Sequence, residues 1–293
     1  MHHHIHRGVR WGVIGAMLLG AVALLAGCGG GNATVASGSV PATLSFSGTS
    51  GTGATGLSMP MATLANGVGV DTFRFGVSKI ELHAIATAST DTSTVTSQEG
   101  GSSSGDDNAA EFKGDFIVDL IGGTIQDVVG GGAATSLPSF LPAGSYEELD
   151  FKLTPEPGVD TNAPTTPVSL LVAGSYTSPA DGLVRNYSVT VSVPFQVEID
   201  GPNAVLLDGS TNDLIVALHL DALLSPANLD ALLANTEITT QPSPGVYQVT
   251  VDASTSPTSV EQLRQMIKSA LDFGEDHNGD HELEAGEDVS GQS

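Results

Sequence analysis

Side chains that carry oxygen recur near the C-terminus, in the stretch from Asp276 to Glu287. Side-chain oxygens stand at its first, third, fifth, ninth and twelfth positions, and a backbone carbonyl serves the seventh. Ca²⁺ takes six to eight oxygen ligands, and this spacing wraps a chain around one ion that a bidentate carboxylate closes. The predicted calcium ligands are Asp276, Asn278, Asp280, the carbonyl of Glu282, Glu284 and Glu287.

This segment resembles the loop of an EF-hand or of a dockerin-type module. Leu283 occupies the eighth position, where such loops carry an apolar anchor, whereas His281 replaces the glycine usual at the sixth. The resemblance implies weak calcium binding, with a dissociation constant of about 10⁻⁴–10⁻³ M. Two alternatives stay open, namely a solvated acidic tail and a transition-metal site that uses His277 and His281.

The chain contains a single cysteine, Cys28, so no disulfide can form within it. A short basic region with Arg7 and Arg10 precedes an apolar stretch from Gly12 to Ala26. This stretch is shorter than the ~20 residues that span a bilayer, and it is typical of a secretory signal peptide. A signal peptide is therefore predicted at residues 1–27.

The four residues Leu25-Ala26-Gly27-Cys28 resemble the lipobox of bacterial lipoproteins. The resemblance implies cleavage before Cys28, a diacylglyceryl thioether on its sulfur and anchoring in a lipid bilayer. Several acyl chains give stable anchoring, whereas one chain holds only marginally. Gly29 follows the cysteine in place of aspartate, which by analogy with Gram-negative lipoproteins implies an outer-membrane lipoprotein. The alternative is an ordinary signal peptide with a coincidental cysteine.

The chain that would remain after cleavage is strongly acidic. Loss of Arg7 and Arg10 leaves 7 basic residues, of the original 9, against 33 acidic ones. Such a surface repels nucleic acid, which is therefore not an expected partner, and it attracts divalent cations. The expected partners are the bilayer, through acylated Cys28, and an envelope glycan or protein ligand.

Apolar residues alternate with polar ones along much of the chain, which predicts strands with one buried face. In the segment 187–199 every odd position is apolar, and Pro194 on the polar face indicates an edge or a bulge. In the segment 73–82 the alternation changes parity near Ser78 and Lys79, which predicts a β-bulge. Six further strands are predicted around 43–46, 116–121, 149–153, 168–172, 214–220 and 247–251.

Two helices are expected beside these strands. Ser225 and Pro226 provide an N-cap and a first-turn proline for a helix over 227–234. Thr258 and Glu261 form a capping-box pattern for a helix over 258–272 that leads into the calcium loop. The expected fold class is mainly β, an antiparallel β-sandwich with two short helices and a C-terminal helix–calcium-loop appendage.

Two segments poor in apolar residues divide the chain. Residues 28–41 are glycine-rich and are interpreted as a lipidated flexible tether, and residues near 87–108 as a disordered insertion. The predicted organisation is a signal peptide at 1–27, the tether, a sandwich domain at 42–252, and a helix with an acidic tail at 253–293.

Four stretches of the body resemble an uncharacterised domain family found in bacterial lipoproteins. They are FRFGVSKIELHAI at 73–85, FIVDL at 116–120, LPAGSYEELDFKL at 141–153 and LIVALHLDALL at 214–224. The chain departs from that family in carrying Glu148 and Asp150 where a basic residue is usual. The resemblance implies a β-sandwich at the cell surface and brings no known activity.

No sequence motif predicts a catalytic site. The glycine pattern at 51–56 lacks a following amphipathic helix, and His83 and His219 lie in predicted strands without a nearby serine or carboxylate motif. The prediction is therefore a membrane-anchored, non-enzymatic binding or structural module. Two alternatives remain, namely an envelope hydrolase whose residues meet only in the fold, and a calcium-dependent module that recruits a partner.

Overall fold

The computed structural model describes residues 38–49, 62–84, 109–208, 212–277 and 283. The mainly β fold class is confirmed, because strands dominate this part of the chain and helices are few and short. The strands are β1 (Ser39–Thr49), β2 (Ala62–Thr63), β3 (Gly69–Ala84), β4 (Ala109–Asp119), β5 (Thr124–Asp127), β6 (Ala133–Ala134), β7 (Leu137–Pro142), β8 (Gly144–Leu153), β9 (Leu170–Thr177), β10 (Val184–Val191), β11 (Phe195–Leu207), β12 (Asn212–His219), β13 (Thr239–Ser243), β14 (Val246–Val251) and β15 (Leu271–Glu275). The helices are α1 (Leu220–Leu223), α2 (Pro226–Ala234) and α3 (Pro257–Lys268).

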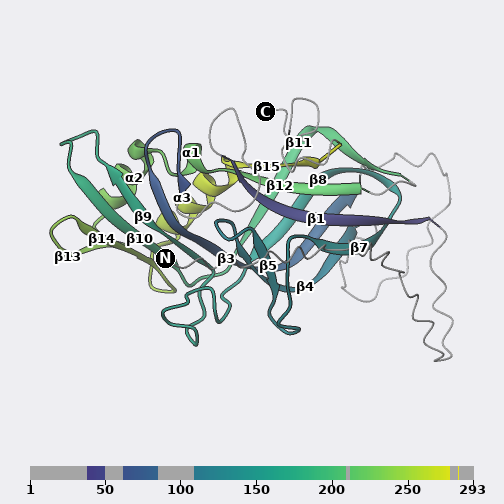
Figure 1. The fold of residues 1–293 in the computed structure, drawn as a ribbon, viewed down its shortest axis with the longest axis horizontal. Helices are drawn as coiled ribbons and strands as arrows, with labels where there is room; N and C mark the ends of the chain where they lie inside the picture. The colour runs from purple at the N-terminus through teal and green to yellow at the C-terminus, as the bar shows by residue number, and fades with distance from the viewer. Residues whose placement is uncertain (1–37, 50–61, 85–108, 209–211, 278–282, 284–293) are drawn as a thin grey trace, which may run out of the picture. The chain divides into compact units, whose positions relative to one another are not determined.

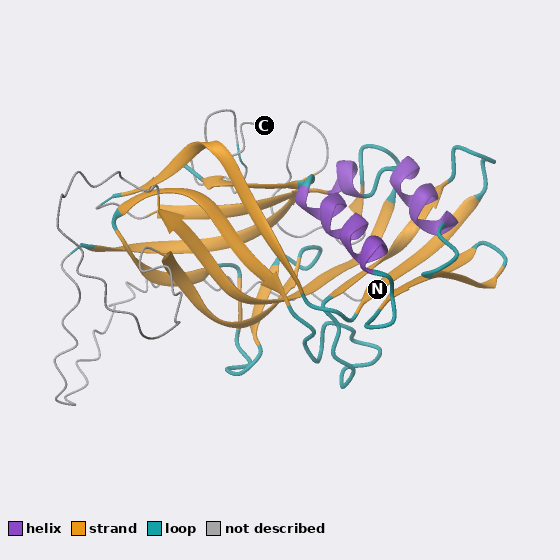
Figure 2. Cartoon of the chain, turned by 180° about the vertical axis from the view of Figure 1, so that it is seen from behind, coloured by secondary structure: helices purple, strands orange, loops and turns teal. Residues whose placement is uncertain are grey.

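Two hydrogen-bonded sheets share one hydrophobic core. The smaller sheet has the strand order β15-β12-β1-β7, and the larger one is built around β3, which pairs with β4, β8 and β9 (Figure 1). The expectation of a wholly antiparallel sandwich needs correction, because β1 pairs with β12, and β10 with β14, in parallel. Figure 2 shows the helices gathered over one half of the sheets.

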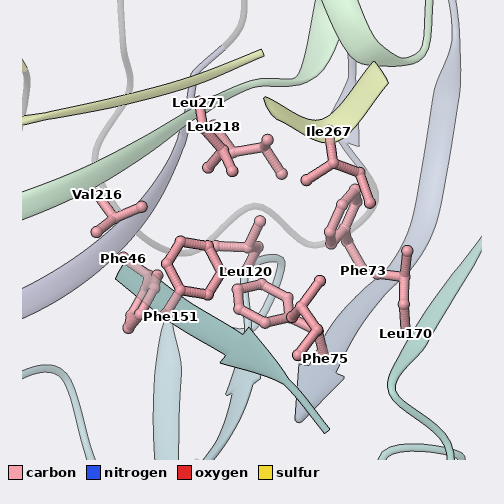
Figure 3. A pocket seen from close by; sticks show the side chains of 11 residues that line it. Phe46, Phe73, Phe75, Leu120, Phe151, Leu170, Val216, Leu218, Ile267 and Leu271 are labelled. Atoms are coloured by element: carbon pink, nitrogen blue, oxygen red, sulfur yellow. The ribbon is translucent and has the colours of Figure 1, made fainter. Parts of the chain in front are cut away.

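The core between the sheets is mostly aliphatic, and it contains a small aromatic cluster. Phe46 of β1 meets Phe75 of β3 and Phe151 of β8 edge to face, with ring centroids 5.7 and 6.2 Å apart. A cavity of about 20 Å³ remains beside them, lined only by apolar side chains (Figure 3). This is room for little more than one water molecule, and an apolar cavity offers water no hydrogen bonds. Among the described residues, this cavity therefore has no room for a ligand larger than water.

All eight predicted strands coincide at least in part with observed ones, and the predicted bulge in β3 is confirmed. The pairing of β3 with both β4 and β8 shifts register between Ser78 and Ile80. Lys79 lies between them with a φ of 52°, which an L residue adopts only when its surroundings require it. The bulge restores the alternation, so that Val77, Ile80 and Leu82 all reach the core.

The single long strand predicted over 187–199 is wrong, because the segment divides into β10 and β11. Pro194 lies in the break and is exposed. Proline has no N–H to donate to a ladder, so pairing cannot continue through it. β10 lies between β9 and β14 and pairs with both. β11 pairs with β8 instead.

Helix α2 begins as predicted, with Ser225 accepting a hydrogen bond from the backbone N–H of Asn228 at 3.2 Å. For α3 the predicted N-cap and end are both wrong. Ser256, rather than Thr258, is the N-cap, and it accepts from the N–H of Ser259 at 3.3 Å. The helix ends at Lys268.

The residues expected to continue that helix form strand β15 instead. Leu271 fits the helical face of Leu263 and Ile267, but it also alternates with Phe273 as in a strand. β12 offers an edge whose backbone groups need partners. β15 pairs with β12 over five residue pairs, from Leu214 opposite Glu275 to Leu218 opposite Leu271. The C-terminal segment is therefore part of the smaller sheet and not an appendage.

The expected domain boundaries shift accordingly. One compact unit spans Ala36–Ser293, so residues 253–275 belong with the sandwich. β1 begins at Ser39, so the last three residues of the expected tether are in a strand. The expected signal peptide and the insertion near 87–108 lie outside the described residues. Within the described part of the chain, none of the helices is long and apolar enough to cross a membrane.

Candidate metal centre

A row of carboxylates crosses four neighbouring strands of the larger sheet. Glu111 of β4 is paired with Glu81 of β3, Glu81 with Asp150 of β8, and Asp150 with Glu198 of β11. Because neighbours along a strand point to opposite faces, these side chains stand on the face opposite to the core residues beside them, such as Leu82. Like charges directly opposite one another destabilise a sheet. The row therefore calls for a counter-charge.

Two lysines supply that counter-charge at the sides of the row. Lys79 Nζ lies 3.0 Å from an oxygen of Glu81. Lys268, from α3, lies 4.0 Å from Glu198 and 3.5 Å from Asp200. Neither of these ion pairs includes Asp150, which is in the middle of the row.

Asp150 is held between His83 and Gln196. Gln196 on β11 donates a hydrogen bond from Nε2 to Asp150 Oδ2 at 2.7 Å, and His83 Nε2 lies 3.6 Å from the same oxygen. Glu148 lies on the same face two positions earlier on β8, opposite His83. One ligand atom from each of His83, Glu148 and Asp150 falls within 4.8 Å of the others.

Two atoms of this group are buried and accept or donate no hydrogen bond to any residue the structure describes. They are His83 Nε2 and Asp150 Oδ1. Asp150 as a whole is only 8% exposed. A buried polar atom without a partner costs free energy, so its persistence in a fold needs a reason. Imidazole nitrogen and carboxylate oxygen together are a ligand set for a divalent metal ion.

The pKa values of Asp150 and Glu148 are both raised above their ordinary values. Burial is the main cause that raises the pKa of Asp150, and the nearby carboxylates of Glu198 and Glu81 add to it. Burial also raises the pKa of Glu148, and the charge of Asp150 adds to that effect. Carboxylates that are desolvated and crowded in this way are stabilised in the charged form by a bound cation.

Most of the site residues predicted from the sequence lie outside the described residues. This holds for Cys28 and for Asn278, Asp280, Glu282, Glu284 and Glu287 of the expected calcium loop. Asp276 is described and is 6% exposed, and its backbone N–H donates to the carbonyl of Asp213 at 2.8 Å. The loop would thus start from the end of β15 and not, as predicted, from a helix.

A hydroxyl, an imidazole and a carboxylate also line up at one end of the smaller sheet. Thr49 Oγ1 lies 3.0 Å from His219 Nδ1, and His219 Nε2 lies 2.6 Å from Asp272 Oδ2. This order of groups can activate a nucleophile. Thr49, however, is only 8% exposed, and a nucleophile must reach its substrate. The arrangement is better explained by the need of the buried Asp272 carboxylate for a partner.

Comparison with known proteins does not indicate a function for this chain. No family model and no curated protein matches the chain. Among solved structures, MbnP from Methylosinus trichosporium aligns over 63% of this chain and 77% of its own, with 15% identity and a TM-score of 0.34. A likeness at that level establishes neither a shared fold nor a shared function.

Proposed function

We propose that this protein is an exported lipoprotein, anchored in the outer membrane through Cys28, whose sandwich is a non-enzymatic module that binds divalent cations. The observation that carries the proposal is the row of carboxylates across β4, β3, β8 and β11, with the buried Asp150 at its centre. A strongly acidic chain concentrates cations near its surface, and this row presents them with ordered oxygen ligands.

The anchor is supported by the lipobox-like residues before Cys28 and by the small, polar stretch that follows. In cells fed an alkyne analogue of palmitate, the wild type is expected in the membrane fraction with the label attached. Cys28→Ser is expected to lose the label and to keep residues 1–27, which intact-mass spectrometry detects. The chain has no other cysteine. A labelled Cys28→Ser protein, or an unlabelled wild type cut elsewhere, would contradict the anchor.

A second cation, Ca²⁺, is proposed for the C-terminal loop, supported by the spacing of its oxygen donors. Calorimetric titration of the full chain in detergent is expected to show one weakly bound calcium ion. This binding should be lost in both Asp276→Ala and Glu287→Ala. Asp288→Ala, one position beyond the loop, is the matched control and should bind as the wild type does. Absence of binding at millimolar calcium, or equal binding by Glu287→Ala, would show that the tail is only a solvated charge run.

A further inference from the structure

We propose that His83, Glu148 and Asp150 hold one divalent transition-metal ion of the zinc class on the outer face of β3 and β8. This inference rests on the proposed cation-binding function and names the ion and the ligands that the sheet face would use. It concerns a different place from the C-terminal loop, and no residue is shared between the two.

The burial of Asp150 separates this group from an ordinary cluster of surface acids. Asp150 is 8% exposed, and its Oδ1 has no hydrogen-bond partner among the described residues. His83 Nε2 is in the same condition and lies on the same side, 3.6 Å from Asp150 Oδ2. A buried carboxylate with one oxygen left without a partner carries a desolvation penalty, which a bound metal ion would offset.

The distances suit a small ion. Two ligand atoms that are each about 2.1 Å from a tetrahedral metal ion lie roughly 3.4 Å apart. The separation of 3.6 Å between His83 Nε2 and Asp150 Oδ2 is close to that value. Glu148 reaches the same place from the next outward position of β8. Three protein ligands leave a further position for water, as in open zinc sites.

Gln196 acts as the residue that orients Asp150. Its Nε2–H donates to Asp150 Oδ2 at 2.7 Å, which fixes the plane of the carboxylate. Hydrogen bonds of this kind to a metal ligand set its orientation, and their loss typically costs 10- to 100-fold in metal affinity. We therefore expect Gln196 to matter for affinity although it does not touch the ion.

The imidazole decides the class of ion. Ca²⁺ and Mg²⁺ prefer oxygen alone, whereas imidazole nitrogen suits zinc and its first-row neighbours. Without His83 the face would offer only carboxylates. With it, the set is one nitrogen and two carboxylate groups, in which Zn²⁺ should outcompete Ca²⁺.

The test titrates the full chain in detergent with Zn²⁺, Co²⁺ and Ca²⁺ separately. The chain carries Cys28→Ser, which keeps residues 1–27 and removes the thiol, together with His2→Asn, His3→Asn, His4→Asn and His6→Asn. Neither the cysteine nor the N-terminal histidines can then bind the ion. Calorimetry should give a zinc ion whose affinity falls at least tenfold in His83→Ala, Asp150→Asn and Glu148→Gln, and about tenfold in Gln196→Ala. The visible absorption of bound Co²⁺ should change in His83→Ala. Glu261→Gln, which removes an exposed carboxylate of α3 outside the row, is the matched control and should bind zinc as the parent chain does.

Folding of each variant is followed by a thermal melt with and without zinc. The wild type should melt higher with zinc, because an ion that binds only the folded chain stabilises it, and Asp150→Asn should melt equally with and without it. Zinc binding unchanged in both His83→Ala and Asp150→Asn overturns the inference. If the chain binds calcium but not zinc, and Asp150→Asn loses the calcium, the inference is overturned and the cation-binding function is kept. Absence of any cation binding overturns both.

Discussion

Replacement of Phe273 by alanine is expected to lower the free energy of unfolding by about 4 kcal/mol. Phe273 is completely buried in β15, opposite Val216 of β12, and belongs to the core that both sheets share. Removing a buried phenylalanine loses its transfer free energy and leaves a cavity, which typically costs about 3–5 kcal/mol. Denaturant unfolding followed by circular dichroism measures the change, and the midpoint of thermal unfolding should fall by roughly 10 °C.

Phe140→Ala is the matched control for this experiment. Phe140 lies in β7, the edge strand at the other side of the same sheet, and is 74% exposed. Its loss should change stability by about 0.5 kcal/mol or less. If Phe273→Ala lowered the free energy of unfolding as little as Phe140→Ala, β15 would not be part of the core. The helix over 258–272 predicted from the sequence would then be the better description.

Gly174→Ala is the second substitution for which we expect a large effect, a loss of about 3 kcal/mol. A Cβ at Gly174 would stand 2.0 Å from the carbonyl oxygen of Gly69 and 2.9 Å from the hydroxyl oxygen of Tyr187. The first contact is with backbone, so relief requires β9 and β3 to move apart where Gly174 pairs with Val70. Forced expansion of a packed interior usually costs about 1–3 kcal/mol, and a backbone clash belongs at the upper end.

Gly132→Ala controls for the general effect of adding a methyl group. Gly132 lies on the surface, and a Cβ added there would meet no other atom within 4 Å. Its substitution should leave the unfolding midpoint in urea almost unchanged. Equal stability of the two alanine variants would mean that β3 and β9 do not approach as closely as the structure shows.

The strands were the most predictable part of the fold, since hydrophobic alternation depends on residues close in sequence. The bulge at Lys79 is the clearest success, because a parity change can be explained only by an extra residue. The prediction for the segment 269–274 was wrong because its structure depends on residues distant in sequence. Leu271 fits the helical face of Ile267 and also alternates with Phe273 as in a strand. Only the edge of β12, more than 50 residues earlier in the sequence, decides between helix and strand.

The candidate metal centre could be predicted only in part. Alternation along a strand places Glu148 and Asp150 on one face, and both stood out as departures from a usually basic position. His83 was interpreted as an isolated strand histidine. Its position opposite Glu148 depends on the register between β3 and β8, which the bulge at Lys79 shifts. Cross-strand register is set by the whole sheet, so no local pattern contains it.

The parallel pairing of β1 with β12 has a consequence for the order in which the molecule can assemble. Thr43 of β1 hydrogen-bonds Asp213, 170 residues later in the chain. The smaller sheet therefore cannot close until β12 and β15, near the end of the polypeptide, have been synthesised. Closing so long a loop is slow, because its entropic cost comes before any contact offsets it. Until β12 is available, β1 lacks its parallel partner, and its unpaired edge needs protection from aggregation.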